Sequence, residues 1–320
     1  YLLFYYATLL QEPIERIREE LELLQQAQAS LQRIQDLLGQ QSQVNPGGQA
    51  VLPSGALAVE FDDVWFGYGQ GGRYQASGTR CQVSETQNPT PYTLQNLNLN
   101  LSAGQTLGLL GHTGSGKSTL ARLLLRLHDI QQGQICLGGV DIAQVSLREL
   151  AQRVGFVTQD VQLFQTSVRN NLTFFNSHIS DETILQTLED LGLTPWLEAL
   201  PAGLETELGA DSGGLSAGQA QLLAFARVFL KDPGLVVLDE ASSRLDPLTE
   251  QLIERAVDRL LANRTGIIIA HRLKTIERAD QILILEQGQM AEYGDRASLA
   301  SNPHSRFAQL LKTGISAQSR

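Results

Sequence analysis

The sequence predicts an α/β fold built around a largely parallel β-sheet and preceded by one long helix. From residue 106 onwards, short apolar runs typical of buried strands alternate with amphipathic segments of helical period. A glycine-rich loop directly follows one of these apolar runs and opens a helix. This alternation indicates parallel strands with helices on both sides of the sheet.

The first 38 residues are predicted to form a single helix. Apolar residues recur at steps of three and four from Leu10 to Leu38, charged residues occupy the other faces, and Pro13 is the one helix-breaking residue. The apolar start, Tyr1–Leu10, has about half of the roughly 20 residues that span a bilayer. It also lacks the charged region of a signal peptide. Composition leaves two interpretations open, the end of a short buried helix or the last turns of a membrane helix.

The composition changes after this helix. Residues 39–55 are polar and rich in Gly and Pro, which predicts a linker. Two short strands are expected at 57–61 and 64–66, and residues 69–91 have the Gly, Ser, Thr and Gln content of an inserted surface loop. The further strands are expected at 97–101, 106–110, 134–137, 154–157, 235–238, 266–270 and 281–286, and the further helices at 117–128, 181–191, 219–229, 247–261 and 296–311.

Overall composition excludes several classes of protein. Hydrophobic residues make up 42% and charged residues 18%, which is typical of a globular protein. The net charge of −10 repels phosphate backbones and the sequence has no basic run, so we expect no nucleic-acid partner. The two cysteines, Cys81 and Cys136, are too few for a disulfide framework or a zinc site.

One motif indicates phosphate chemistry. Gly111–Thr119 matches G-x-x-x-x-G-K-[ST] in full, between an apolar strand and a helix. Its glycines allow backbone N–H groups to converge on phosphate oxygens, and the helix N-terminus adds partial positive charge. Lys117 is placed to neutralise the β- and γ-phosphates, and the Ser118 hydroxyl to ligate Mg²⁺. ATP and Mg²⁺ are therefore the expected ligands.

A second apolar run, Leu235–Leu238, ends in two acids. Asp239 is placed to hold Mg²⁺, through water, and Glu240 to polarise an attacking water. Acidic residues also occur at strand ends for structural reasons, so the assignment depends on its pairing with the phosphate loop.

The segment Leu215–Gln219, with the sequence LSAGQ, resembles the LSGGQ signature of ATP-binding cassette (ABC) ATPases, with Ala217 in place of the first glycine. This resemblance implies a P-loop NTPase (RecA-like) core with an antiparallel β subdomain and an inserted α-helical signature subdomain, preceded by the long N-terminal helix. The ABC nucleotide-binding domain is then expected at 56–315, its helical subdomain at about 160–225, and an insertion at 69–91.

Other landmarks of the family occur in the same order. Tyr68 resembles the aromatic platform for adenine, Gln159 the Q-loop glutamine and His271 the switch histidine. Thr206–Gly209 resembles the X-loop of exporters, in which Glu207 is expected to contact the membrane domain, and Ser243–Asp246 resembles the D-loop, with Arg244 where alanine is usual. Motifs and resemblance together assign catalysis to Glu240, His271 and Gln159; nucleotide binding to Tyr68, Gly111, Thr113, Gly114, Ser115, Gly116, Lys117, Ser118, Thr119, Ser216, Gly218 and Gln219; and Mg²⁺ binding to Ser118, Gln159 and Asp239.

Residues 1–38 are similar to the cytoplasmic end of the last transmembrane helix of exporter half-transporters, with Pro13-Ile14 and Arg33-Ile34 in matching places. The resemblance favours the truncated membrane helix over the buried one. It implies an ATP-hydrolysing subunit that powers export through head-to-tail dimerisation, at the cytoplasmic face of the cell membrane. The expected partners are a second nucleotide-binding domain, identical or different, and the transmembrane domains of the transporter.

Rival interpretations come from other classes. A soluble ABC ATPase of chromosome maintenance or DNA repair carries a long coiled coil between Q-loop and signature, for which the interval from Gln159 to Leu215 is too short. A non-hydrolysing regulatory partner of a heterodimeric transporter remains open because of Ala217 and Arg244, although Glu240 and His271 argue against it. An importer subunit would lack the leading membrane-helix segment.

Overall fold

The computed structural model divides the chain into two compact units, Tyr1–Gln43 and Val44–Arg320. The boundary between them falls inside the predicted linker. Each unit is described by itself. The residues that the structure describes are 1–39, 44–68, 92–158, 161–208, 215–239, 247–270 and 273–313.

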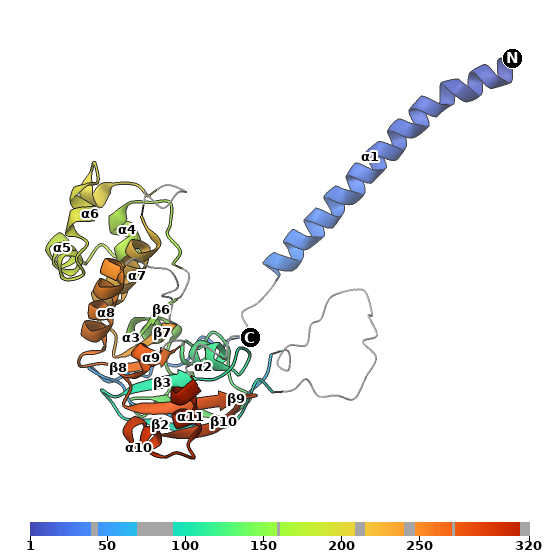
Figure 1. The fold of residues 1–320 in the computed structure, drawn as a ribbon. Coiled ribbons are helices and arrows are strands. Elements are labelled where there is room, and N and C mark those ends of the chain that lie inside the picture. The colour runs from blue at the N-terminus through green and yellow to red at the C-terminus, as the bar shows by residue number, and fades with distance from the viewer. Residues whose placement is uncertain are drawn as a thin grey trace. The chain divides into compact units, whose positions relative to one another are not determined.

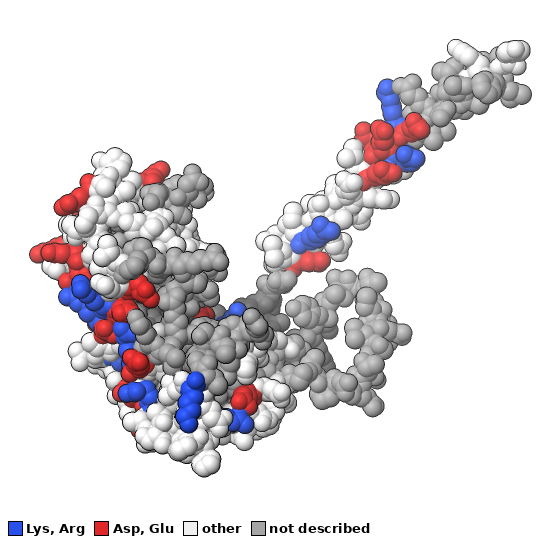
Figure 2. Space-filling model, in the orientation of Figure 1, with Lys and Arg blue, Asp and Glu red and all other residues white. Residues whose placement is uncertain are grey.

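The first unit is helix α1 (Leu2–Leu38), which continues through Pro13. This confirms the predicted helix. Charged side chains gather in one band of α1, residues 15–22, and the next ten residues carry none (Figure 2). Apolar side chains such as Leu24 and Ile34 are exposed within this chain. Among the described residues, no helix has both the length and the apolar character that crossing a bilayer requires.

The second unit is organised around a six-stranded sheet with the strand order β10-β9-β3-β8-β7-β6. Every neighbouring pair is parallel except β9 with β10, which form an antiparallel pair at the edge. The predicted parallel sheet is thus confirmed, with an antiparallel edge strand added. The strands are β3 (Thr106–Leu110), β6 (Val154–Val157), β7 (Leu235–Asp239), β8 (Thr265–Ile269), β9 (Gln281–Glu286) and β10 (Gln289–Asp295).

Both faces of this sheet are buried, which explains the uninterrupted apolar runs. Successive residues of a strand point to opposite faces. In β7, Val236 and Leu238 belong to one apolar core and Leu235 and Val237 to the other. The first core is shared with helices, and the second with an antiparallel sheet and with helical residues such as Leu120, Leu124 and Leu150. One face of the parallel sheet is therefore covered by helices, and the other by the antiparallel sheet together with further helices.

The antiparallel sheet has the order β2-β1-β4-β5. The sequence predicts two short strands before residue 67, whereas the structure has one continuous strand with a register shift between Phe61 and Val64. Asp63 adopts a φ of +44° at this bulge, which interrupts the alternation of apolar residues. The strands are β1 (Val59–Phe66), β2 (Leu94–Leu101), β4 (Gln132–Leu137) and β5 (Val140–Asp141).

The helices fall into two groups. One group, α4 to α7, lies together (Figure 1), and its helix α7 also packs against β6 of the parallel sheet. Its members are α4 (Val168–Thr173), α5 (Asp181–Asp190), α6 (Thr194–Glu198), the 3₁₀ turn η2 (Gly203–Glu205) and α7 (Ala217–Lys231). The other helices are α2 (Lys117–Leu124), η1 (Ile142–Gln144), α3 (Leu147–Arg153), α8 (Pro247–Leu261), α9 (Leu273–Ile276), α10 (Arg296–Ser301) and α11 (Arg306–Thr313).

Two predicted helices end earlier than expected. The segment expected to be helical at 117–128 stops at Leu124, because Arg126 adopts a φ of +50°. The expected helix at 296–311 is divided into α10 and α11, and Pro303 lies between them. A proline cannot donate the backbone hydrogen bond that a continuous helix needs.

Candidate functional site

Five parallel strands end at the same edge of the central sheet, and the predicted site residues lie at or after the carboxyl ends of four of them. Gly111 follows β3 directly and Asp239 is the last residue of β7. Gln159, Glu240 and His271 lie outside the described residues, as do the D-loop residues and the insertion at 69–91. In the sequence they come one or two residues after β6, β7 and β8. Their predicted roles stay predictions.

The glycines of the phosphate loop are required by its backbone. Gly111, Gly114 and Gly116 have φ values of +147°, +82° and +108°, which residues with a Cβ rarely adopt. A Cβ on Gly111 would lie 2.3 Å from the carbonyl oxygen of Leu285. A Cβ on Gly116 would lie 2.6 Å from a Leu94 methyl. At Gly111 and Gly116 the loop therefore has no room for a Cβ, whereas at Gly114 the positive φ alone favours glycine.

Helix α2 presents unmatched donors at its N-terminus. Its N-cap is Gly116, which supplies no side-chain hydrogen bond, whereas α3, α4, α5, α7 and α10 each have a Ser or Asp cap. The first backbone N–H groups of a helix have no intrahelical partner. The buried Ser115 Oγ also lacks a hydrogen-bond partner among the described residues. An anionic ligand would satisfy the helix N-terminus.

Lys117 is held inside the loop. Its Nζ donates to the carbonyl oxygens of Gly111, at 2.7 Å, and of His112, at 2.9 Å. The side chain is buried, and this burial lowers the pKa of Lys117, an effect that the charge of Asp239 opposes. Asp239 is thus close enough to act on the lysine electrostatically. The structure brings together these two predicted residues, which belong to the first turn of α2 and the end of β7.

Tyr68 is the exposed member of the three neighbouring aromatic residues. It is 41% exposed, whereas Phe66 is buried and Trp65 is half-buried. The Tyr68 hydroxyl lies 3.3 Å from Thr119 Oγ1, in the first turn of α2, and accepts from Arg122 at 3.2 Å. The ring packs edge-on against Phe66 and His128. An exposed ring fixed beside the phosphate loop is suited to stack on a base.

The LSAGQ segment forms the N-terminus of α7. Ser216 is the N-cap: its Oγ accepts from the Gln219 N–H at 3.2 Å, and Gln219 Oε1 accepts from the Ser216 N–H at 2.9 Å. This is a reciprocal capping box. Ala217 is the first helical residue, so no left-handed conformation is imposed on it. The Ser216 hydroxyl still has its proton to donate to an external acceptor.

Comparison with known proteins identifies this arrangement. Residues 94–243 match the sequence profile of a family described as ABC transporter. This chain belongs to that family. ABC transporter domains bind ATP and hydrolyse it to power transport. The predicted family and fold class are therefore confirmed.

The proteins similar to this chain include a fatty acid transporter, a flippase and an exporter. The chain is 36% identical over 90% of its length to a fatty acid ABC transporter ATP-binding/permease protein from Mycobacterium bovis, of which it covers 42%. It is 33% identical over 97% of its length to an ATP-dependent lipid A-core flippase from Alcanivorax borkumensis, of which it covers 50%. A bacterial Atm1-family ABC exporter solved with ATP bound matches with a TM-score of 0.73 and 30% identity, over 90% of this chain and 47% of that one. The chain spans about half the length of these relatives.

The residues available for Mg²⁺ in this ABC domain match the chemistry of that ion. The described residues contain no cluster of three or more His, Cys, Asp or Glu side chains that could hold a metal. Mg²⁺ is commonly bound by one or two protein oxygens together with nucleotide phosphates and water. The exposed Ser118 hydroxyl and the half-buried Asp239 carboxylate suit such a site.

One pair of structural residues was not singled out from the sequence. Arg227 of α7 donates through Nε to the carbonyl oxygen of Asn171 at 2.8 Å, and through Nη1 to that of Gln162 at 2.9 Å. Asn171 is fully buried, and its amide donates to the carbonyl of Phe164. Burial lowers the pKa of Arg227. The sequence did carry a signal for this pair: Arg227 stands within an otherwise apolar helical run, and a charged group buried there needs hydrogen-bond partners.

Proposed function

We propose that this chain is the ATP-binding and ATP-hydrolysing part of an ABC exporter and powers the transmembrane export of a substrate. The observation that carries this proposal is the arrangement of Lys117 and Asp239 at one edge of the sheet, with the signature at the start of α7. The names of the relatives, which include a flippase and a fatty acid transporter, support export as the work performed.

The chain would bind the nucleotide through its own groups. Tyr68 stacks on adenine. The N–H groups from Gly114 to Thr119 hold the phosphates at the N-terminus of α2, and Lys117 exchanges its two carbonyl partners for phosphate oxygens. The net charge on the phosphates favours the protonated lysine, which offsets the effect of burial.

The signature serves a second molecule. The Ser216 hydroxyl, the Gly218 N–H and the N-terminus of α7 form an anion site separate from the phosphate loop. In a head-to-tail dimer, each signature would contact the γ-phosphate held by the Lys117 of the other copy. Loss of the γ-phosphate would remove the acceptor and release the dimer. The second copy is an identical or a related domain.

Hydrolysis in this arrangement is an attack of water on the γ-phosphorus, which breaks the bond to the β,γ-bridging oxygen. Glu240 accepts the proton of the water, and His271 and Gln159 hold the γ-phosphate and the attacking water in line. Ser118, Asp239 and Gln159 would hold Mg²⁺, which when bound would neutralise charge on the phosphate oxygens.

A membrane domain is the expected second partner, at the cytoplasmic face of the membrane. Three aromatic side chains gather on the α4 side of the helical group: Phe164, Phe174 and Phe175 are 48%, 56% and 63% exposed. The ring of Phe164 lies 6.0 Å from that of Phe174, and the Arg227 guanidinium lies 5.0 Å above the Phe174 ring. We propose that the permease region of the same transporter covers this surface, because relatives of about twice this length are named ATP-binding/permease proteins.

The proposal is tested by ATP turnover against protein concentration. We expect turnover per molecule to rise with concentration as dimers form. Glu240→Gln should retain ATP binding and reduce turnover by orders of magnitude. Full turnover at dilutions at which sedimentation detects monomers alone would contradict the shared site. Near-normal turnover of Glu240→Gln would contradict the role of Glu240 as proton acceptor, but it would not contradict the shared site of the dimer.

A further inference from the structure

Helix α4 holds the segment that leads towards the signature. The Val168 N–H donates to the Thr206 carbonyl at 3.0 Å, and the Leu208 N–H donates to the Thr166 carbonyl at 2.9 Å. Ser167, the N-cap of α4, therefore pairs with Glu207 as in a two-stranded sheet. The described chain after Leu208 resumes at Leu215, one residue before the signature serine.

The same short helix also holds the segment that leaves the signature. Arg227, on the third turn of α7, bonds to the carbonyl oxygen of Asn171 and, at 3.1 Å, to its side-chain oxygen. Asn171 belongs to α4 and is fully buried. The chain on both sides of the signature is thus fastened to one six-residue helix.

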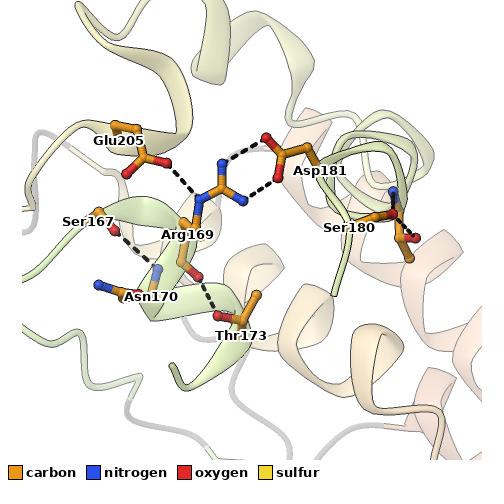
Figure 3. Close-up of polar contacts among 8 residues, drawn as sticks. Ser167, Arg169, Asn170, Thr173, Ser180, Asp181 and Glu205 are labelled. Atoms are coloured by element: carbon orange, nitrogen blue, oxygen red, sulfur yellow. Dashed lines mark hydrogen bonds and ion pairs between the residues drawn. The ribbon is translucent and has the colours of Figure 1, made fainter. Parts of the chain in front are cut away.

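Arg169 lies at the centre of this connection (Figure 3). Its guanidinium engages both oxygens of Asp181, the first residue of α5, with Nη2 at 2.8 Å from Oδ2. Its Nε donates to Glu205 Oε1 at 2.6 Å, immediately before the Thr206–Leu208 segment. These hydrogen bonds raise the pKa of Arg169 and lower the pKa of Asp181. One side chain therefore spans α4, α5 and η2.

The energy of these ion pairs is small in comparison with their geometric effect. Asp181 and Glu205 are 61% and 63% exposed, and exposed ion pairs contribute little to the free energy of unfolding. A planar guanidinium that is bidentate to one carboxylate and bound to a second nevertheless fixes the relative orientation of the groups that carry them. Loss of Arg169 should therefore alter the position of the Thr206–Leu208 segment more than the stability of the fold.

We propose that Arg169 is a positioning residue for the signature. Through Glu205 and Asp181 it fixes the orientation of the Thr206–Leu208 segment, which precedes the signature in the chain, so that Ser216 meets the nucleotide of a second copy of the chain. The inference rests on the proposed function, because it requires the ATP-dependent dimer. It assigns Arg169 to formation of the dimer and gives it no contact with the nucleotide bound by its own chain.

The test uses the whole chain with Glu240→Gln, which keeps ATP intact, and measures the Mg-ATP dimer by sedimentation equilibrium. Arg169→Gln should weaken the dimer about three- to tenfold, because the Thr206–Leu208 segment would no longer be held in the orientation that the dimer requires. ATP affinity measured by calorimetry at concentrations that keep the chain monomeric should stay within about twofold. Arg169→Lys should restore little, because an ammonium group cannot reproduce the fork.

The matched control is Arg259→Gln. Arg259 of α8 pairs with Asp190 at the other end of α5, with a nitrogen–oxygen distance of 3.2 Å and 54% exposure of Arg259. Among the described residues, its ion pair and its hydrogen bond both go to Asp190, so it fastens α5 without bonding to α4 or η2. We expect a similar change in thermal stability from both variants and a weaker dimer from Arg169→Gln alone. Glu205→Gln removes the charge of one of the two carboxylates that bind Arg169 and is a milder second variant. It should also weaken the dimer, but less than Arg169→Gln does.

The outcomes separate the two proposals. Equal dimer affinity in Arg169→Gln, Glu205→Gln and Arg259→Gln would overturn the positioning role and leave the proposed function intact. Failure of the Glu240→Gln chain to dimerise with Mg-ATP at any concentration would overturn the proposed dimer, and this inference with it.

Discussion

The phosphate loop allows a sharp test of backbone geometry with Gly111→Ala. In the left-handed half of φ space, a residue with a Cβ loses roughly 1–2 kcal/mol. At Gly111 the new Cβ would in addition lie 2.3 Å from the Leu285 carbonyl oxygen and 2.6 Å from Ser115 Oγ, and overpacking of this kind costs about 1–3 kcal/mol. We therefore expect Gly111→Ala to lower the free energy of unfolding by about 2–5 kcal/mol, or to displace the loop and abolish ATP binding.

Gly104→Ala is the matched control for this prediction. Gly104 has a φ of +80°, and a Cβ there would meet nothing within 4 Å. Gly104→Ala should lower the free energy of unfolding by only about 1–2 kcal/mol and leave the ATP affinity unchanged. Urea unfolding without nucleotide measures the free energy of unfolding, and calorimetry with Mg-ATP measures the ATP affinity. Equal losses of stability in the two variants, together with wild-type ATP affinity in Gly111→Ala, would refute the steric argument.

Two further predictions concern nucleotide binding. Tyr68→Ala should weaken ATP binding about tenfold or more, since one stacked base is worth about 1–3 kcal/mol, whereas Tyr68→Phe keeps the ring and should lose less; equal calorimetric affinities of all three proteins would exclude the platform role. Because burial lowers the pKa of Lys117, the free protein loses this charge at a pH below the ordinary lysine value of 10.5. ATP affinity should therefore fall as the pH rises through that lowered pKa, and this dependence should disappear in Lys117→Gln.

The local sequence pattern was sufficient for several strands of the parallel sheet. The bounds of β3, β6 and β9 agree with those predicted from their apolar runs, because most residues of these strands are buried on both faces of the sheet. The phosphate loop was equally predictable. Its glycines, its lysine and the helix behind it form one continuous segment, so that no distant residue is needed to recognise it.

Other elements depended on contacts that no local pattern encodes. Helix α11 begins at Arg306 partly because Glu292 of β10 accepts from the N–H groups of Arg306 and Phe307. Strand β10 itself was not predicted, since its residues are half-buried and do not alternate clearly. Arg126, whose left-handed backbone ends the predicted helix, is buried and donates to the carbonyl oxygens of Ile142 and Val145. For α11 and for Arg126 the hydrogen-bond partner lies in another element of the chain.

The sequence by itself determined the class of fold, the family and the place of the glycine-rich loop at Gly111–Thr119, because spacing along the chain carries that information. The tertiary structure decided what stands beside the motifs: Tyr68 against Thr119, Asp239 within electrostatic reach of Lys117, and α4 against both flanks of the signature. The physical reason is that a hydrogen bond or an ion pair depends on distance in space, and the chain sets that distance only after its apolar faces have packed.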